Sequence, residues 1–278
     1  MRFAIKTSPQ NTTWDAMLEV WRAADDVEVF ESGWTFDHFY PILGENSSGP
    51  CLEGWVTLTA LAQATRRLRL GTLVTGIHYR HPAVLANMAA TLDIISGGRL
   101  ELGIGAGWNT EESGAYGIEL GTPRQRSDRF EEACEVLVGL LTQEVTTFAG
   151  DYYQLTDARC EPKPVQRPHP PICIGGSGEK RTLRTAARFA QHWNFVGGTV
   201  EQFTRARDVL YDHCADVGRD PSEILLSSHV FFAGDAGESA ASAAALGDAG
   251  VELVIVTMRP PHTAAALESL ANALAPLA

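Results

Sequence analysis

A closed (β/α)8 barrel of the TIM type is the fold class that the sequence predicts. Segments with strand-like and helix-like patterns alternate along the chain, and eight of each can be assigned, the number that a closed barrel needs. A length of 278 residues suits an α/β barrel, so we expect a single domain over residues 1–278. Gly103, Gly105 and Gly107 end one buried strand, which indicates that another group approaches the backbone there. A doubly wound open sheet is the alternative, but it would not require eight units.

The first four strand–helix units are predicted from apolar periodicity and from the residues that begin or end helices. Thr13 is expected to cap the first helix, Pro82 fits the first turn of the third, and Gly97 ends the third. The fourth helix is expected to begin after Ser127. We place the strands at 2–6, within 27–36, at 70–75 and at 100–109, and the second helix at 54–65.

Four further units follow a long break in this pattern. Residues 142–171 are too long for an ordinary connection between two elements. Within them, Val145–Leu155 predicts an inserted hairpin between the fourth helix and the fifth strand. We place the remaining strands at 172–174, 192–196, 224–232 and 251–257, and the helices at 179–190, 201–217, 238–249 and around 267–274.

Composition and charge exclude several classes of partner. The chain has 22 Lys and Arg residues against 34 Asp and Glu, a net charge of −12, so we expect no nucleic-acid partner. No apolar run reaches the roughly 20 residues of a membrane span, and Met1–Thr7 is typical of a strand rather than a signal peptide. The five cysteines form no Cys-x-x-Cys pair, which indicates reduced thiols and a cytoplasmic location. Cys134, Cys173 and Cys214 are expected in the core.

Two polar residues follow the predicted second strand. Asp37 and His38 stand beside each other among aromatic residues, so they could place a proton-transfer group against a planar ligand. The competing interpretation is a solvated loop in which Asp37 caps a turn and His38 is exposed. Because the carboxyl ends of barrel strands carry function, we favour proton transfer.

Glycines follow the predicted fifth strand and lead into a predicted helix. The free N–H groups of such a helix N-terminus bind anions, so Gly175–Gly178 predicts a phosphate site. Lys180, Arg181 and Arg184 lie in the first turns and could supplement it. A plain glycine hinge is the alternative. Ser-His-Asp catalysis is poorly supported, because Ser177 does not lie in a Gly-x-Ser-x-Gly elbow.

The other strand ends leave alternatives open. His78 and His81 could hold an anionic group or belong to a solvated turn, and a metal is less supported because zinc wants three or four ligands. The glycine series ending at Gly107 either lets a helix pack on the strand or admits a ligand. Trp108 either walls that ligand or belongs to the core.

Together these segments resemble the bacterial luciferase-like monooxygenase superfamily. The run SGGRLELGIGAGWN at 96–109 is typical of the superfamily. The runs FESGWTFDHFYPI at 30–42 and PPICIGGSGEKRTL at 170–183 resemble its actinobacterial branch of F420-dependent oxidoreductases. The resemblance extends from the first strand to about Asn194 and is diffuse beyond.

This resemblance implies a barrel with the cofactor across its carboxyl-end mouth, commonly in a homodimer. Members of the family carry a non-proline cis peptide in the third strand, which here would fall at Leu73–Val74. Asp37 and His38 would face the deazaflavin, with His38 as proton donor. The implied cofactor-binding residues are Leu73, Val74, Thr75, Gly76, Gly107, Trp108, Gly175, Gly176, Ser177 and Gly178, the last three holding its phosphate.

Three functions follow from these expectations. The first is hydride transfer between coenzyme F420 and a small organic substrate. The second keeps the barrel but binds FMN, whose reduced form activates oxygen for a monooxygenation. The third is a protein that binds a flavin-like molecule without turnover. Relatives that act on a sugar phosphate carry an acid where this chain has Trp108, which argues against that substrate class.

Overall fold

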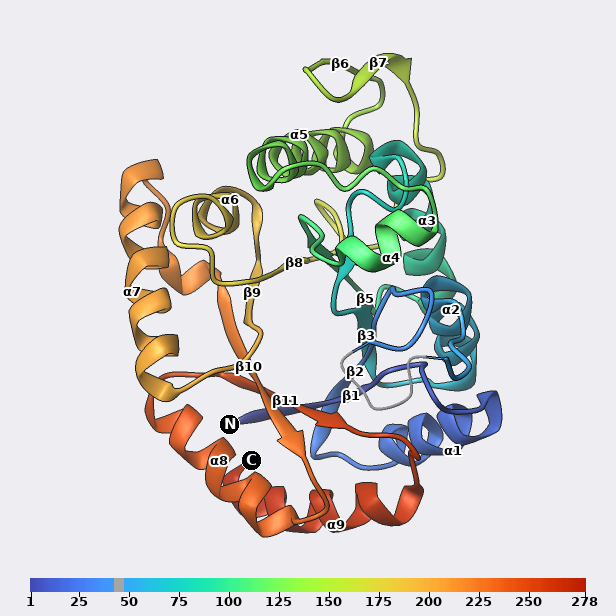
Figure 1. Ribbon diagram of the computed structural model, residues 1–278, viewed down its shortest axis with the longest axis vertical. Helices are drawn as coiled ribbons and strands as arrows, with labels where there is room; N and C mark the ends of the chain where they lie inside the picture. The colour runs from blue at the N-terminus through green and yellow to red at the C-terminus, as the bar shows by residue number, and fades with distance from the viewer. Residues whose placement is uncertain (43–47) are drawn as a thin grey trace.

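A closed barrel of parallel strands, surrounded by helices, forms the body of the computed structural model, which describes residues 1–42 and 48–278 (Figure 1). The strand order is β3-β2-β1-β11-β10-β9-β8-β5-β4, and pairing of β3 with β5 closes the ring. The predicted (β/α)8 barrel is therefore confirmed. The barrel strands are β1 (Arg2–Thr7), β2 (Phe30–Thr35), β3 (Arg69–Thr72), β4 (Thr75–Gly76), β5 (Leu100–Gly105), β8 (Ile172–Gly175), β9 (His192–Phe195), β10 (Leu225–Phe232) and β11 (Leu253–Met258).

The predicted third strand is divided in two. A cis peptide joins Leu73 to Val74, between β3 and β4, as the family resemblance implies. Both halves pair with β5, so β3 and β4 together occupy one place in the ring and the barrel has the expected eight. The prediction of a continuous strand over 70–75 is therefore wrong.

The glycines at the end of β5 and just after it are approached closely by another group, as the sequence predicts, and that group is the neighbouring segment of the chain. A Cβ on Gly103 would overlap the carbonyl oxygen of Thr72, and one on Gly105 would lie 2.9 Å from a methyl group of Val74. A Cβ on Gly107 would overlap the His78 ring, and its φ of 84° also favours glycine. These glycines thus accommodate the irregular neighbouring segment, rather than a packed helix.

Helices cover the outside of the barrel and begin at residues suited to the N-cap. The Thr13 hydroxyl accepts a hydrogen bond from the Ala16 amide at 3.2 Å, which confirms the first predicted cap. The α-helices are α1 (Trp14–Asp25), α2 (Gly54–Ala64), α3 (Pro82–Ser96), α4 (Thr110–Ala115), α5 (Pro123–Thr142), α6 (Thr182–Phe189), α7 (Val200–Val217), α8 (Ala236–Asp248) and α9 (Ala264–Leu274); short 3-10 turns are η1 (Pro221–Glu223) and η2 (Ala275–Leu277). No helix in the described ranges is long and apolar enough to cross a membrane.

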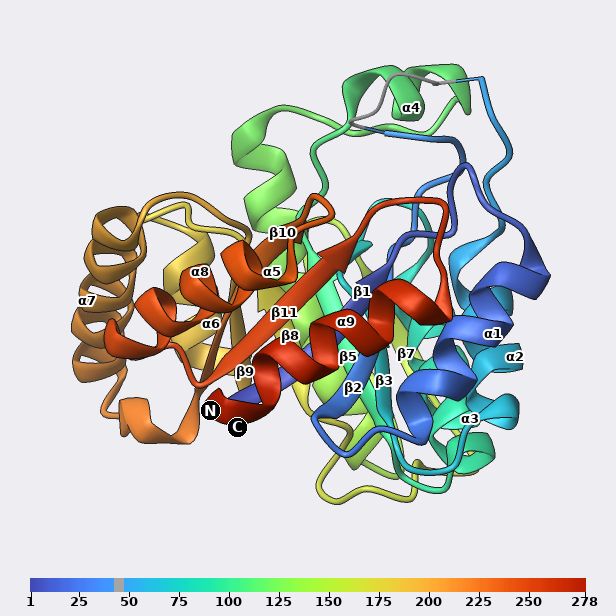
Figure 2. The same ribbon diagram turned by 90° about the horizontal axis from the view of Figure 1, so that it is seen from below.

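Two predicted helix starts need correction, and one helix was not predicted. Helix α5 begins at Pro123 rather than after Ser127, because Thr122 and Gln125 cap each other's backbone amides. Helix α6 begins at Thr182 rather than 179, so the glycines end in an irregular turn before it. Helix α4 was missed, since the sequence around it is rich in glycine and polar residues. Figure 2 shows α4 beyond the ends of the barrel strands.

A two-stranded antiparallel sheet stands outside the barrel, where a hairpin was predicted. It consists of β6 (Thr146–Ala149) and β7 (Gln154–Ala158) and lies beside α5 (Figure 1). The Glu132 carboxylate of α5 accepts hydrogen bonds from the amides of residues 151–153 at 2.8–3.1 Å. This carboxylate fixes the turn of the hairpin to the scaffold.

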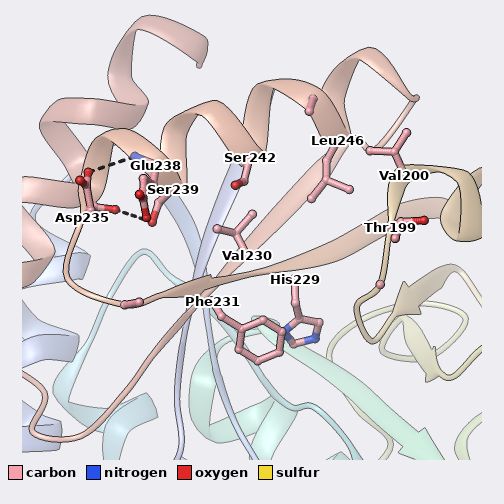
Figure 3. Close-up of a pocket in the computed structure, with 13 residues that line it drawn as sticks. Thr199, Val200, His229, Val230, Phe231, Asp235, Glu238, Ser239, Ser242 and Leu246 are labelled. Atoms are coloured by element: carbon pink, nitrogen blue, oxygen red, sulfur yellow. Dashed lines mark hydrogen bonds between the residues drawn. The ribbon is translucent and has the colours of Figure 1, made fainter.

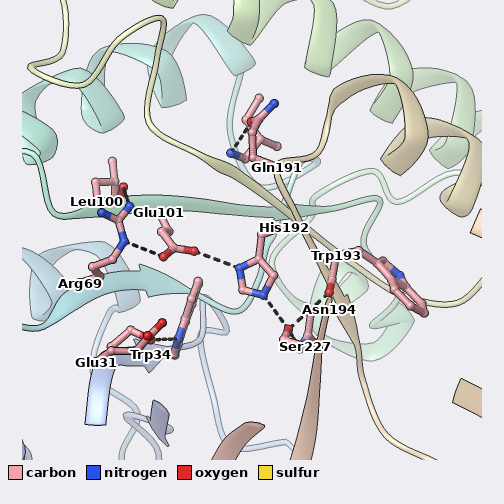
Figure 4. Close-up of polar contacts among 12 residues, drawn as sticks. Glu31, Trp34, Arg69, Leu100, Glu101, Gln191, His192, Trp193, Asn194 and Ser227 are labelled. Carbon is pink, nitrogen blue, oxygen red and sulfur yellow. Dashed lines mark hydrogen bonds and ion pairs between the residues drawn. The ribbon is translucent and has the colours of Figure 1, made fainter. Parts of the chain in front are cut away.

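Polar side chains form a hydrogen-bonded chain through the barrel interior (Figure 4). Arg69 Nε donates to Glu101 Oε1 at 2.8 Å, and Glu101 Oε2 lies 2.9 Å from His192 Nδ1. His192 Nε2 contacts the Ser227 hydroxyl at 2.6 Å, and Asn194 Nδ2 donates to that hydroxyl at 2.9 Å. Each of these five side chains therefore has a hydrogen-bond or ion-pair partner within the series. Outside the ring the core is apolar, and it includes the predicted Cys134 and Cys214, while Cys173 is buried within the barrel.

Candidate active site

A cavity of about 520 Å³ opens at the carboxyl ends of the barrel strands. The glycine-bearing ends of β4, β5 and β8 share one rim, where Gly76, Gly105 and Gly175 lie. Of the predicted site residues, the cavity is lined by His38, Leu73, Val74, Gly76, Gly107, Trp108, Gly175 and Gly176; Asp37, Thr75, Ser177 and Gly178 do not line it. The remaining lining residues are Lys6, Phe36, Ile42, Tyr79, Gly105, Ala106, Thr182, Asn194, Val196 and His229.

His38 is held at the cavity wall by a carboxylate that the sequence did not indicate. Its Nδ1 lies 2.7 Å from Oε2 of Glu112, a fully buried residue of α4. The hydroxyl of Tyr79 donates to the same oxygen and lies 3.3 Å from His38 Nδ1. The Phe39 amide donates to the other oxygen of Glu112 at 2.6 Å. Because Nδ1 is engaged, Nε2 is the nitrogen left to exchange a proton with a bound molecule.

The Glu112 carboxylate is kept ionised by these contacts. Burial by itself would raise its pKa, but hydrogen bonds from His38, Tyr79 and the Phe39 amide outweigh burial and lower it. Burial and the hydrogen bond to Glu112 raise the pKa of Tyr79, so its hydroxyl stays protonated and donates. An ionised Glu112 accepts the Nδ1 proton of His38 and thereby fixes the orientation of the ring.

Aromatic rings surround His38 on the cavity side. Phe36 meets the imidazole edge-on with ring centroids 5.0 Å apart, and Trp108 lies 5.7 Å away in a similar arrangement. Trp108 is 53% exposed, so it belongs to the cavity wall rather than to the core. These rings form an apolar surface against which a flat ring system can lie.

Asp37 points away from the cavity, although it is adjacent to His38 in sequence. Its carboxylate forms an ion pair with Arg80, whose second nitrogen lies 3.1 Å from Asp37 Oδ1. Arg80 in turn lies 3.7 Å from Glu53. The expectation that Asp37 and His38 present their side chains to one ligand is not met by this geometry. Asp37 instead anchors the loop that carries His38.

Thr75 also lies behind the cavity. Its hydroxyl accepts a hydrogen bond from Trp55 Nε1 at 2.9 Å and contacts the Thr72 hydroxyl at 2.8 Å. Thr75 is fully buried, so it supports β4 rather than contacting a ligand directly.

The glycine segment before α6 contributes backbone atoms of Gly175 and Gly176 to the cavity lining. The basic side chains predicted to supplement it do not reach the cavity. The Gly176 amide donates to the Asn194 carbonyl at 3.1 Å, while Ser177 and Gly178 are exposed beyond the cavity lining. Arg181 pairs with Asp128 of α5, and Arg184 lies 3.0 Å from Glu131 of that helix. The hydroxyl-bearing Thr182 lines the cavity instead.

The histidines after β4 have structural roles. Burial lowers the pKa of His78 to about 4, and its Nε2 lies 3.1 Å from the Ser113 hydroxyl. His81 caps α3, since its Nδ1 accepts a hydrogen bond from the Ala83 amide. Neither residue lines the cavity. Across residues 1–42 and 48–278, no group of three metal-ligating side chains could hold a metal ion.

A second hollow of about 380 Å³ lies between β10 and α8 (Figure 3). The Asp235 carboxylate lies there and accepts hydrogen bonds from the amides of Gly237 and Glu238 at 2.8 and 3.0 Å. Because Glu238 adds a second carboxylate to the same lining, this hollow disfavours an anionic group. His229 lines both this hollow and the main cavity.

Several residues of the site were missed from the sequence. Tyr79, Lys6, Asn194 and His229 line the main cavity, and Glu112 holds His38 from behind it. A local signal existed for Glu112. The spacing Asn109-x-x-Glu112 is that of a helix N-terminus, and Asn109 does accept the Glu112 amide at 3.1 Å. Lys6, Asn194 and His229 are single residues on separate strands, and Tyr79 lies in the bend after β4, so no local motif groups them together.

Comparison with known proteins gives the following similarities. A family model described as luciferase-like monooxygenase matches residues 1–277, so the similarity continues beyond Asn194. The chain is 35% identical over 169 residues to an uncharacterized protein of Mycobacterium tuberculosis, covering 61% of this chain and 58% of that protein. It is 35% identical over 147 residues to F420-dependent glucose-6-phosphate dehydrogenase of Amycolatopsis mediterranei, covering 52% of this chain and 44% of that enzyme. The chain thus spans about half the length of the curated relatives it matches.

Among solved structures, similar folds cover the whole chain. An F420-dependent secondary alcohol dehydrogenase in complex with an F420–acetone adduct superimposes with a TM-score of 0.87. The two sequences are 21% identical, and the match covers 100% of both chains. This similarity supports the barrel fold.

Proposed function

Because this chain belongs to the luciferase-like monooxygenase family, we propose that it is an oxidoreductase that transfers a hydride between coenzyme F420 and a small organic substrate. The observation that carries this proposal is His38, whose Nδ1 is held by Glu112 while the residue lines a glycine-edged cavity. A relative 35% identical over 147 residues is an F420-dependent dehydrogenase. A homodimer, which the family resemblance implies, and a cytoplasmic location, which the cysteine content indicates, are further predictions.

The residues of the cavity suit a flat, largely apolar ring system with a charged tail. Val74, Gly76, Gly107 and Trp108 would bound the ring, and Gly175, Gly176 and Thr182 would lie toward its phosphate. When bound, the coenzyme supplies or accepts the hydride. His38 Nε2 would deliver a proton to the substrate or remove one, and Phe36 and Trp108 would exclude water from that nitrogen.

Two alternatives come from different observations. The family description is of monooxygenases, so FMN with oxygen activation is the second candidate. The related enzyme from Amycolatopsis is named for glucose 6-phosphate, yet Trp108 places an indole beside His38 in this chain. We therefore propose a substrate other than a sugar phosphate. The third candidate is binding without turnover.

A cofactor titration tests the proposal. We expect oxidised F420 to bind with a change in its absorbance, and reduced F420 to be reoxidised when an acceptor is supplied. FMN is expected to bind more weakly. Tight FMN binding without F420 binding would favour the monooxygenase. Binding of F420 with no turnover of any acceptor in a carbonyl and enone panel would favour the third candidate.

Glu112→Gln is expected to lower kcat/KM by about 10- to 100-fold, because a hydrogen bond to a charged group contributes about 1.5–3 kcal/mol. The amide can still contact His38 Nδ1 but cannot hold it with a negative charge. Glu111→Gln is the matched control, since Glu111 is the exposed neighbour on the same helix. We expect F420 affinity to stay within about twofold in both variants, since neither residue lines the cavity. Equal activity of the two variants would contradict the role given to Glu112.

A further inference from the structure

We propose that Lys6 is the counter-ion for an anionic group of the molecule that fills the floor of the main cavity. The ammonium of Lys6 is the charged anchor, and the polar side chains beside it are held neutral by their own contacts. The proposal deepens the function proposed above and rests on it where the anion is that of the coenzyme.

Lys6 lies near the end of β1 and lines the cavity. Its register partners are Trp34 on β2 and Thr257 on β11. Within the described part of the chain, Lys6 Nζ has no ion pair with any carboxylate. No Asp, Glu or Arg belongs to the described lining of this cavity. Its positive charge therefore faces the cavity without a protein counter-charge.

The neighbouring His229 is kept from adding a second charge. Its Nδ1 lies 2.9 Å from the Thr257 hydroxyl, and its Nε2 lies 3.0 Å from Asn194 Oδ1. Burial and the positive charge of Lys6 hold the pKa of His229 well below its ordinary value. The Asn194 amide group is also engaged, since Nδ2 donates to Ser227. The cavity floor thus offers one cation beside neutral groups.

An ammonium without a partner is costly in a partly desolvated site. Burial lowers the pKa of Lys6 to about 8, so the side chain is still mostly protonated at neutral pH. A methionine of similar length would fill the same space without this cost. We therefore expect Lys6→Met to unfold at a higher temperature than the wild-type protein without ligand at pH 7. Binding of an anion would explain why a lysine that lowers the stability of the unliganded protein occupies this position.

The anionic group has two sources with shared chemistry. One is the delocalised negative charge that a reduced flavin or deazaflavin ring carries. The other is a carboxylate or enolate on the substrate. Both present oxygen acceptors to an ammonium, and a charge-assisted hydrogen bond would form in either case.

The experiment measures binding rather than turnover. Wild-type protein, Lys6→Met, Lys6→Arg and the control Arg124→Gln are titrated with oxidised and reduced F420, and with oxidised and reduced FMN. Benzoate and its neutral analogue benzamide are titrated onto each protein with and without cofactor. Arg124 is a matched control for loss of one positive charge, since its side chain is 89% exposed on α5.

If the ring is the source, Lys6→Met weakens reduced FMN about tenfold or more and leaves oxidised FMN, whose ring is neutral, within about twofold. For F420, whose conjugated ring hydroxyl is ionised near neutral pH in the oxidised form, Lys6→Met weakens both states. If the substrate is the source, Lys6→Met weakens benzoate about tenfold and leaves benzamide and both cofactor states unchanged. Lys6→Arg retains part of the wild-type affinity in either case, because arginine keeps the positive charge.

The proposal would be overturned if Lys6→Met bound all these probes with wild-type affinity. It would also be overturned if the wild-type protein bound no anion at all. The proposed function fails separately. If F420 does not bind to the wild-type protein but reduced FMN or benzoate depends on Lys6, the anchor stands without the F420 function.

Discussion

His38→Asn is expected to lower kcat/KM for F420-dependent turnover by about 10²–10⁴-fold, the usual contribution of a general acid or base. Asparagine retains a short side chain with a donor that can reach Glu112, but it has no nitrogen equivalent to Nε2. The proton would then have to come from water, and the Phe36 and Trp108 rings give this position apolar surroundings. The measurement is steady-state oxidation of reduced F420 with the acceptor that the wild-type enzyme prefers.

Binding separates loss of chemistry from loss of structure. We expect His38→Asn to bind oxidised F420 within about threefold of the wild-type affinity, because Gly76, Gly107 and Gly176 still bound the cavity. His81→Asn is the matched control, because asparagine is a good N-cap and His81 caps α3 outside the cavity. A His38→Asn enzyme with full turnover would show that another group moves the proton.

Glu101→Ala is expected to destabilise the protein by about 3–5 kcal/mol, the cost of breaking a buried ion pair by removing one partner. Glu101 is 4% exposed, and its two oxygens hold Arg69 and His192 inside the barrel. Truncation leaves the Arg69 guanidinium without its carboxylate partner and removes the group that His192 Nδ1 contacts. Urea unfolding at pH 7 measures this difference as a change in the free energy of unfolding.

A second acidic residue provides the control for this experiment. Glu31 pairs with Arg2 at 2.7 Å, but the Arg2 side chain is 48% exposed. Exposed pairs contribute about 0–1 kcal/mol, so Glu31→Ala is expected to lie in that range. Similar losses in the two variants would mean that the interior chain of polar groups does not stabilise the barrel.

Glu101 also makes part of the free energy of unfolding dependent on pH. Burial alone would raise the pKa of Glu101, but His192 and Arg69 more than offset it and lower the pKa from 4.5 to about 2. A folded-state pKa below the unfolded one stabilises above pH 4.5, and this contribution is lost as the pH falls toward 2. It amounts to about 3 kcal/mol, and Glu101→Ala should lack that part of the acid dependence.

The order of strands and helices was predictable because each element buries one face and therefore repeats its apolar residues with a local period. The first helix and its Thr13 cap illustrate this, and so does α3 between Pro82 and Gly97. The errors were the starts of α5 and α6, the missed helix α4 and the division of the third strand into β3 and β4. The start of α5 at Pro123 depends on side-chain hydrogen bonds of Thr122 and Gln125, a signal present in the sequence but not used.

The site was predicted in part. His38 and the glycines of three strands were identified, because residues after barrel strands share one rim whatever their separation along the chain. Asp37 shows the limit of such reasoning, since adjacency in sequence did not decide which way its side chain points. Arg80, 43 residues away, holds it instead.

The sequence by itself determined that this chain forms an eightfold parallel barrel and that His38 lies at the carboxyl ends of its strands. Both follow from short-range patterns and from the general geometry of the fold. Only the tertiary structure decided that Glu112, 74 residues away, holds His38 and that Lys6 faces the cavity without a counter-charge. It also decided that the glycines of β5 lie against the irregular segment between β3 and β4, which leaves no space for a side chain. These are contacts between residues far apart in the chain, and no local pattern encodes which distant side chain fills a given space.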